Sequence, residues 1–241
     1  IKNKMKNQCW KLWHSNVVTW DGQITPCCFD KDADYSMGNL NDSSLDDIWS
    51  NNKYDKFRKK ILKDYPQTLF PSPYFREVKL ASERFGMQKE IIYSVIRQES
   101  SFNPKARSHA DAFGLMQLLP ESAESKSHLS DIDYSEPEDL FHPRTNILLG
   151  AAHLKGLFAK YNGQFIPSIA SYNADERAIR TWIKTRYKGD SLEFIEEIPY
   201  KETRGYVRLV LRNMVFYQLV LSKEKQLLFP EWTLKLSANN L

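Results

Sequence analysis

One stretch, QKEIIYSVIRQESSFNPKARSHADAFGLMQLLP at positions 88–120, constrains this chain more than any other. Its first part has helical spacing, because four residues fall at i, i+3, i+4 and i+7 and share one face: Ile92, Val95, Ile96 and Glu99. A carboxylate on a buried stripe is costly unless it is paired or protonated, and burial favours the protonated form that a general acid needs. The spacing therefore predicts either a catalytic carboxyl at Glu99 or a structural ion pair with a neighbouring arginine.

The residues after this helix make the pattern more specific. Asn103-Pro104 is expected to end the helix, since proline cannot continue it. A polar loop then leads to GLMQ at 114–117, and Pro120 fits the first position of the next helix. The run ESSFNPKARS followed by GLMQLLP resembles the catalytic region of lytic transglycosylases, which share the goose-type lysozyme fold.

That resemblance, which extends from about Tyr65 to Lys223, implies roles for individual residues. It implies that Glu99 is the only catalytic carboxylate and that Ser108 assists it. It also implies that Gln117 lines the glycan groove and that Met116 belongs to the substrate-binding residues.

A second motif, SYNAD at 171–175, resembles the YNAG of the same family. The resemblance implies that Tyr172 contacts the catalytic glutamate or the sugar and that Asn173 shapes the groove. The alternative for Tyr172 is an aromatic residue of the core. Asp175 stands where the family has glycine, so the conformation of this turn is open.

A third motif, IPYKETRGYV at 198–207, resembles the IP-x-x-ETR-x-YV of the family. There the glutamate, here Glu202, helps to bind the saccharide, although an acid at a helix N-terminus also has a purely structural use. Tyr206 and Tyr217 lie about three turns apart on one helix face. Either could reach the groove, and the sequence does not choose between them.

The chemistry implied by the resemblance needs one carboxyl group. Glu99 would protonate the oxygen of the bond between N-acetylmuramic acid and N-acetylglucosamine, then take the proton of the C6 hydroxyl, which closes a 1,6-anhydro ring. Neither metal nor cofactor is expected for this reaction. Asp111 is near in sequence but has no counterpart in the family. The alternatives are a lysozyme-type hydrolase that uses the same Glu99, and a glycan-binding module without activity.

Composition divides the chain into two modules. Residues 1–62 contain no glutamate, all three cysteines and four of the six tryptophans. We expect a first module at 1–62, a proline-rich extended linker at 63–73, and a lytic transglycosylase domain at 74–241.

The first module is expected to be a β-hairpin followed by a helix. Val17–Trp20 and Gln23–Pro26 flank Asp21-Gly22, which favours a type I′ turn. After a loop containing Gly38, Ser44 fits the N-cap of a helix that runs to about Leu62.

The cysteines of this module resemble those in the front half of the SPASM or twitch domain of radical S-adenosylmethionine enzymes, where they help to hold an auxiliary iron–sulfur cluster. Three are present, Cys9, Cys27 and Cys28, whereas a [4Fe–4S] cluster normally takes four thiolates. The ligand set is therefore incomplete. The alternatives are free thiols and a zinc site that includes His14. A fragment of a radical enzyme is accordingly the third candidate function.

The second module is expected to be helical throughout, which makes the fold mainly α: a lysozyme-like, all-helical catalytic domain preceded by the small hairpin-plus-helix module. Besides the Glu99 helix, apolar stripes and caps predict helices at 75–85, 146–161, 165–172, 175–185 and 203–222. The polar stretch 123–139 is expected to be mostly loop, with a short helical start.

Charge and hydropathy limit the partners. The net charge of +4 suits an anionic polymer, and the resemblance implies peptidoglycan glycan strands. No basic cluster interleaved with aromatic residues indicates nucleic acid. No apolar run approaches the roughly 20 residues of a transmembrane helix. We expect the periplasm or cell envelope, with any export signal outside this chain, or the cytoplasm if the cysteine module sets the location. The oligomeric state is not indicated.

Overall fold

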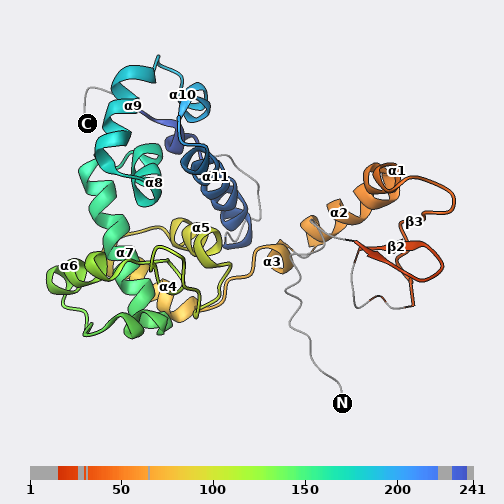
Figure 1. Ribbon diagram of the computed structural model, residues 1–241, viewed down its shortest axis with the longest axis horizontal. Helices are drawn as coiled ribbons and strands as arrows, with labels where there is room; N and C mark the ends of the chain where they lie inside the picture. The colour runs from red at the N-terminus through yellow and green to blue at the C-terminus, as the bar shows by residue number, and fades with distance from the viewer. Residues whose placement is uncertain (1–15, 27–29, 31, 65, 222–229, 238–241) are drawn as a thin grey trace. The chain divides into compact units, whose positions relative to one another are not determined.

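The computed structural model of the chain describes residues 16–26, 30, 32–64, 66–221 and 230–237. It divides into two compact units, residues 1–71 and residues 72–241, and each is described here by itself (Figure 1). We call them unit 1 and unit 2. The stretch that was expected to be an extended linker contains a short helix, α3 (Pro66–Leu69).

Unit 1 contains a three-stranded antiparallel sheet in the order β1-β2-β3. The strands are β1 (Val17–Val18), β2 (Gln23–Thr25) and β3 (Gly38–Asn39). The hairpin is confirmed, but its turn is not type I′. Within the turn at 19–22, only Gly22 has a positive φ, of 84°. Its N–H donates to the carbonyl of Thr19, so the turn is a type I turn that ends in a left-handed glycine. The third strand was not predicted.

The helix expected after Ser44 is present as two helices, α1 (Leu45–Ser50) and α2 (Asn52–Asp64). Ser44 is the N-cap, as predicted, and its hydroxyl accepts the N–H of Asp47. Asn51 interrupts the helix because its side chain has two other partners. Its amide donates to the carbonyl of Met37 at 2.8 Å, and its oxygen accepts the N–H of Tyr54 at 2.8 Å.

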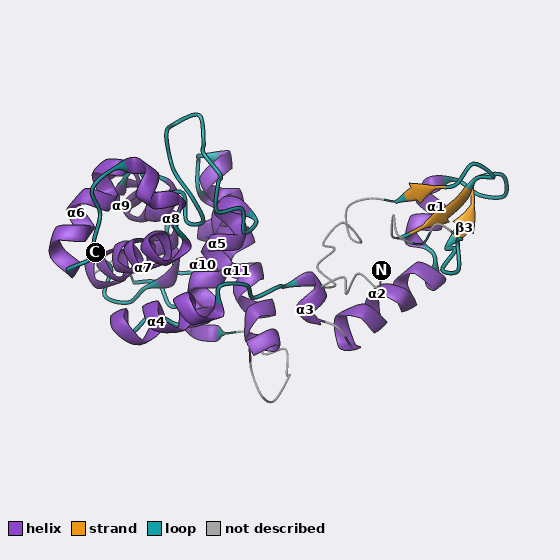
Figure 2. Ribbon diagram, turned by 90° about the horizontal axis from the view of Figure 1, so that it is seen from below, coloured by secondary structure: helices purple, strands orange, loops and turns teal. Residues whose placement is uncertain are grey.

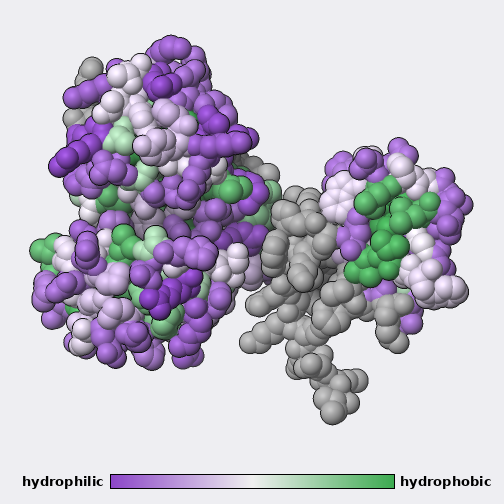
Figure 3. Space-filling view, viewed as in Figure 1, coloured by the Kyte–Doolittle hydropathy of each residue, from purple (hydrophilic) through white to green (hydrophobic). Residues whose placement is uncertain are grey.

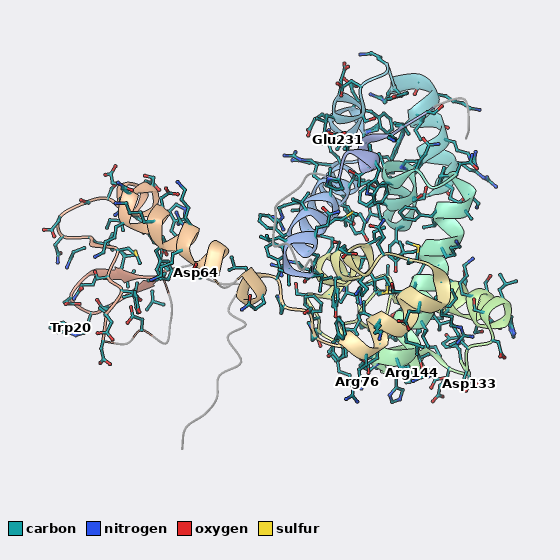
Figure 4. All side chains as sticks on the ribbon, turned by 180° about the vertical axis from the view of Figure 1, so that it is seen from behind. Trp20, Asp64, Arg76, Asp133, Arg144 and Glu231 are labelled. Carbon is teal, nitrogen blue, oxygen red and sulfur yellow. The ribbon has the colours of Figure 1, made fainter. Side chains whose placement is uncertain are left out.

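The core of unit 1 is small. Among the described residues, four side chains form its core cluster, with Trp49 and Phe57 packed against them: Ile24, Met37, Ile48 and Tyr54. At the end of the hairpin, Trp20 is 98% exposed and projects outward (Figure 4). Figure 3 shows an apolar patch on one face of this unit. The described part of unit 1 therefore combines a small core cluster with apolar side chains left at the surface.

Unit 2 is helical, and among the described residues strands occur only in unit 1 (Figure 2). Its α-helices are α4 (Phe75–Phe85), α5 (Lys89–Ser100), α6 (Pro120–Ser130), α7 (Pro143–Lys160), α8 (Phe165–Asn173), α9 (Glu176–Arg186), α10 (Ser191–Glu197) and α11 (Lys201–Leu221). Two 3₁₀ helices, η2 (Pro137–Phe141) and η3 (Glu231–Leu234), complete it. None of the helices in the described ranges combines the length and the apolar character needed to cross a membrane.

Two long helices organise unit 2. α7 contacts α4, α6 and α8, whereas α11 contacts α5, α8 and α10, so α8 lies against both (Figure 1). Each of the three helices contributes fully buried side chains: Leu149 and Leu154 on α7, Ile166 and Ile169 on α8, and Val207 and Val210 on α11. The expected all-helical fold is thereby confirmed, and the Glu99 helix, α5, packs along α11.

Several boundaries differ from expectation. The stretch expected to be mostly loop contains the full helix α6, which begins with Pro120 as predicted. α7 begins at Pro143, three residues early, and α10 was not predicted. α5 ends at Ser100, before Asn103, because Ser101 and Phe102 adopt left-handed φ values of 49° and 69°.

Candidate active site

Glu99 lies at the end of the buried stripe of α5. The three apolar residues that share its face, Ile92, Val95 and Ile96, are fully buried, as their spacing predicts. Glu99 itself is half-buried, one turn further along the helix. Its carboxyl group therefore sits at the boundary between the helical core and the surface.

This environment favours the protonated form of Glu99. Burial, the largest influence, raises the pKa of its carboxyl from 4.5 to about 7, and the nearby charge of Glu202 acts in the same direction. A hydrogen bond from the hydroxyl of Tyr206 to Oε1, at 2.6 Å, lowers the pKa in part. At neutral pH both the acid and the carboxylate are consequently populated, as a group that must give and take a proton requires.

The structure separates the two tyrosines that the sequence left open. Tyr206 is on the face of α11 that meets Glu99. Tyr217 is fully buried further along α11, where its ring stacks on Tyr93 at 5.2 Å between centroids. Tyr206 is therefore the residue of the site, and Tyr217 belongs to the contact between α11 and α5.

Tyr172 lies close to Glu99 without a hydrogen bond to it. After burial, the charge of Glu99 is what raises the pKa of the Tyr172 phenol. Its hydroxyl donates to the carbonyl of Met116 at 2.8 Å, and His153 packs against its ring at 5.2 Å. Burial lowers the pKa of His153 to about 4, with a further contribution from Lys126, so this imidazole is neutral at pH 7.

The Met116 side chain does not reach the surface, and its expected contact with substrate stays a prediction. That side chain is fully buried, and a Cβ added to Gly150 of α7 would come within 2.3 Å of its sulfur atom. Met116 fills the space that glycine leaves on α7. The part of Met116 that belongs to the site is its backbone carbonyl, which accepts the Tyr172 hydroxyl.

Gln117 and Ser108 stabilise the loop after α5. Gln117 has a φ of 47°, and its amide donates to the carbonyls of Ala106 and Gly114. The hydroxyl oxygen of Ser108 accepts the N–H groups of Ala110 and Ala112. Among the described contacts, Ser108 makes no hydrogen bond to Glu99, so its role beside Glu99 stays a prediction, as does the contact of Gln117 with the glycan.

Asn173 and Glu202 connect α8 to the start of α11. The side-chain oxygen of Asn173 accepts the hydroxyl of Thr203 at 2.8 Å, and its amide donates to Glu202 at a long 3.4 Å. Glu202 is exposed and so remains available to a ligand. The open question at Asp175 is answered, because its carboxylate caps α9 by accepting the N–H groups of the helix start.

Asp111 does not provide a second carboxylate for the site. It is exposed and paired with Arg107 at 2.8 Å in the loop after α5. Its charge is not among those that act on Glu99, whereas the charge of Glu202 is. Of the two other carboxylates considered, only Glu202 is close enough for its charge to raise the pKa of Glu99.

Sequence reasoning missed two residues that hold the site together. The hydroxyl of Ser100 donates to the carbonyl of Leu115 at 2.8 Å, which ties the catalytic helix to the GLMQ loop. Asn146, fully buried on α7, makes three hydrogen bonds to the backbone of the same region. The available signal was a polar residue at the start of an apolar helix, which must find partners when it is buried.

The cysteines and the proposed zinc ligand cannot be placed in this site or another. Cys9, Cys27, Cys28 and His14 all lie outside the described residues. Within the described part of the chain, no group of three or more His, Cys, Asp or Glu side chains is arranged to hold a metal ion.

Comparison with known families gives three matches. Residues 77–195 match the transglycosylase SLT domain, residues 197–226 match the soluble lytic transglycosylase helical domain, and residues 9–68 match SPASM, an iron-sulfur cluster-binding domain. The first two matches cover the helices that carry Glu99, Tyr172 and Glu202. The third covers most of unit 1.

Individual relatives agree. The soluble lytic murein transglycosylase of Escherichia coli K12 is 33% identical over 172 residues, which are 70% of this chain and 27% of the relative. The membrane-bound lytic murein transglycosylase C of Edwardsiella ictaluri is 39% identical over 168 residues, 61% of this chain and 47% of that protein.

A solved structure, the inactive Glu-to-Gln mutant of the lytic transglycosylase Slt of Pseudomonas aeruginosa, superimposes with a TM-score of 0.63. The two proteins are 30% identical, and the match covers 73% of this chain but only 30% of the Pseudomonas aeruginosa protein. This chain thus spans about a quarter to a half of the relatives it matches. Its unit 2 belongs to the transglycosylase SLT domain family and has the lysozyme-like helical fold of that family.

Proposed function

We propose that this chain cleaves the β-1,4 bond between N-acetylmuramic acid and N-acetylglucosamine in peptidoglycan, as a lytic transglycosylase that leaves a 1,6-anhydromuramic end. The observation that carries the proposal is Glu99, half-buried, with a pKa of about 7 and one oxygen already bound by Tyr206. The names of the relatives support the substrate, murein, and the reaction class.

The first step is the protonation of the leaving group. The Tyr206 hydroxyl donates to Oε1 of Glu99, so the acidic proton is carried by Oε2. That proton goes to the glycosidic oxygen as its bond to C1 breaks, and the N-acetylglucosamine leaves as an alcohol. The acetamido group of the muramic acid stabilises the positive charge that develops at C1.

The second step uses the same group as a base. Glu99, now a carboxylate, accepts the proton of the C6 hydroxyl, and the C6 oxygen bonds to C1 to close the 1,6-anhydro ring. The Tyr206 hydroxyl stabilises the carboxylate by the same hydrogen bond that it made to the acid. Glu99 ends the cycle protonated, so no water enters the product.

A lysozyme-type hydrolase is the second candidate, and one observation favours it. Glycosidases commonly use two carboxyl groups, and the exposed Glu202 acts electrostatically on Glu99. If Glu202 activated a water molecule, the product would have a reducing end. Glu202 instead holds Asn173 and is available to bind the saccharide, which supports the transglycosylase.

The partner of the enzyme would accordingly be the glycan strand of peptidoglycan, reached in the periplasm or cell envelope. We also propose that unit 1, which matches an iron-sulfur cluster-binding domain, contributes nothing to the chemistry at Glu99. Any cluster there would be separate from the sugar reaction, which needs only groups that unit 2 supplies.

The test is Glu99→Gln, assayed on purified peptidoglycan with the products identified by mass spectrometry. The amide keeps the shape of the side chain but cannot give or take the proton. We expect wild type to release 1,6-anhydromuropeptides and Glu99→Gln to lose at least about 10³-fold in turnover, because one group serves both steps.

The matched control is Glu90→Gln, the same substitution at the other end of the same helix, which should retain full turnover. If the wild-type products had reducing ends, the proposed transglycosylase function would be wrong and the hydrolase would be the correct one. Retained turnover in a folded Glu99→Gln protein would contradict both, and Glu202 would become the next candidate.

A further inference from the structure

The backbone at Leu115 and Met116 is held by side chains from three helices. The carbonyl of Leu115 accepts the hydroxyl of Ser100 at 2.8 Å. The N–H of Met116 donates to the side-chain oxygen of Asn146 at 2.8 Å, and its carbonyl accepts the hydroxyl of Tyr172 at 2.8 Å. Ser100 follows Glu99 directly on α5, and Tyr172 lies beside Glu99. This short backbone segment is thus tied to residues that adjoin Glu99 on two helices.

Asn146 is the fully buried side chain among the three that bind this backbone. It is fully buried on α7, and both hydrogens of its amide are used, in bonds of 2.9 Å to the carbonyls of Phe113 and Leu140. With the bond from the Met116 N–H, one side chain fixes the backbone on both sides of Gly114. No other residue type offers two donors and an acceptor of this length in one plane.

The backbone around Asn146 leaves no space for adjustment. Gly114 has a φ of 74°, and a Cβ there would come within 2.1 Å of the Leu140 carbonyl and 2.4 Å of the Asn146 amide. Gly150, one turn along α7, is in similarly close contact with Met116. The loop is therefore pressed against α7 at the position where Asn146 binds it.

We infer that Asn146 is a positioning residue for the reaction at Glu99: it holds the backbone at Leu115 and Met116 where Ser100 binds the Leu115 carbonyl and Tyr172 binds the Met116 carbonyl, and so fixes Tyr172 beside the acid. Asn146 acts through the backbone and does not touch the sugar. The inference rests on the proposed function. A displacement of about 1 Å in groups that orient a substrate can cost about 10²-fold in rate.

The experiment measures kcat and KM on soluble, uncross-linked glycan strands for Asn146→Ala, Tyr172→Phe and the double variant. Asn146→Ala should lower kcat by about 10- to 100-fold. Its KM should change by less than about threefold, because the groove residues Asn173 and Glu202 are untouched. Tyr172→Phe removes only the hydroxyl that binds Met116. If both residues act through that carbonyl, the double variant should lose little more than the worse single variant.

The matched control is Asn213→Ala, which also removes a fully buried side-chain amide, in this case from α11. The Asn213 amide donates to the Ser94 carbonyl over a long distance of 3.4 Å. It should lower the melting temperature and leave kcat unchanged. Multiplicative losses in the double variant, or an equal kcat loss in Asn213→Ala, would reduce Asn146 to an ordinary structural residue and overturn the inference.

Two further results have defined meanings. If Asn146→Ala does not fold, Asn146→Asp keeps the oxygen that Met116 requires and enters the same cycle with the same expected coupling. If wild type releases anhydro products while Asn146→Ala is as fast, the inference fails and the proposed function stands. If wild type releases none, the proposed function fails, and the positioning role fails with it.

Discussion

Unit 1 and unit 2 stabilise their folds by different means. Among its described residues, unit 1 has a core cluster of only four apolar side chains, to which the Ser44 cap and the two bonds of Asn51 add polar contacts. Unit 2 buries apolar faces on α5, α7, α8 and α11. The second kind of fold tolerates costly features, a half-buried carboxyl and left-handed residues at 101 and 102, because its packing over-determines them. A catalytic carboxyl can therefore be held in the extensively packed unit 2.

The largest effect that tests this comparison is the removal of core volume from each unit. Ile48→Ala in unit 1 and Ile96→Ala in unit 2 should each cost about 2 to 5 kcal/mol. Ile48 is one of the few core residues of unit 1, so this loss should unfold it, whereas unit 2 should remain folded with a lower melting temperature. Hydrogen exchange with mass spectrometry checks this, because it reports each unit separately.

In Ile48→Ala, fast exchange should extend over 16–64 while 74–221 stays protected. In Ile96→Ala, exchange should instead become faster within 74–221, with only a partial loss of protection there, while 16–64 keeps its protection. Protection retained in both units of Ile48→Ala would show that polar contacts carry more of unit 1 than its core does.

A smaller effect concerns the carboxyl that unit 2 holds. The pKa of Glu99 rises from 4.5 to about 7 on folding, so folded protein binds this proton more tightly than unfolded protein does. The stabilisation is complete below pH 4.5, is lost as pH rises toward 7, and changes no further above that. Over this window wild type should lose at most about 3 kcal/mol relative to Glu99→Gln.

Thermal melts of the two proteins between pH 4 and pH 8 measure this difference. The gap in melting temperature should widen in favour of Glu99→Gln and then level off. Turnover by wild type should fall over the upper part of the same range, as the acid ionises. A gap that is independent of pH would mean that Glu99 ionises as freely in the folded protein as in the unfolded chain.

The smallest expected effect is in unit 1. With three cysteines where a [4Fe–4S] cluster normally takes four, we expect anaerobic reconstitution with iron and sulfide to give fewer than about four irons per chain. Cys9→Ala is the control, and it should change neither the iron content nor the turnover of peptidoglycan. About four irons per chain with a cluster signal that Cys9→Ala abolishes would prove this prediction wrong.

Local patterns predicted the parts of the fold that depend on neighbours in sequence. The spacing of Ile92, Val95 and Ile96 located the buried face of α5, and Ser44 is the N-cap of α1 as predicted. Helix periodicity and capping need only residues within one or two turns. For the same reason the spacing alone indicated that Glu99 continues the buried stripe of its helix.

Features that depend on distant contacts could not be predicted in this way. The break at Asn51 requires the carbonyl of Met37, and the burial of Met116 requires Gly150 on another helix. Tyr206 and Tyr217 share one face of α11, so only the packing of α5 distinguishes them. In each case the deciding partner is far away along the chain.

The left-handed residues at 101 and 102 have a consequence for proton affinity. By ending α5 at Ser100, they leave Glu99 as the penultimate residue of the helix. The carbonyls in the last turn of a helix carry a partial negative charge, equivalent to about half an electron for the whole helix dipole. That charge opposes the ionisation of a neighbouring carboxyl. A longer helix would place Glu99 away from this negative end, so the abrupt stop itself helps to keep the proton on the acid.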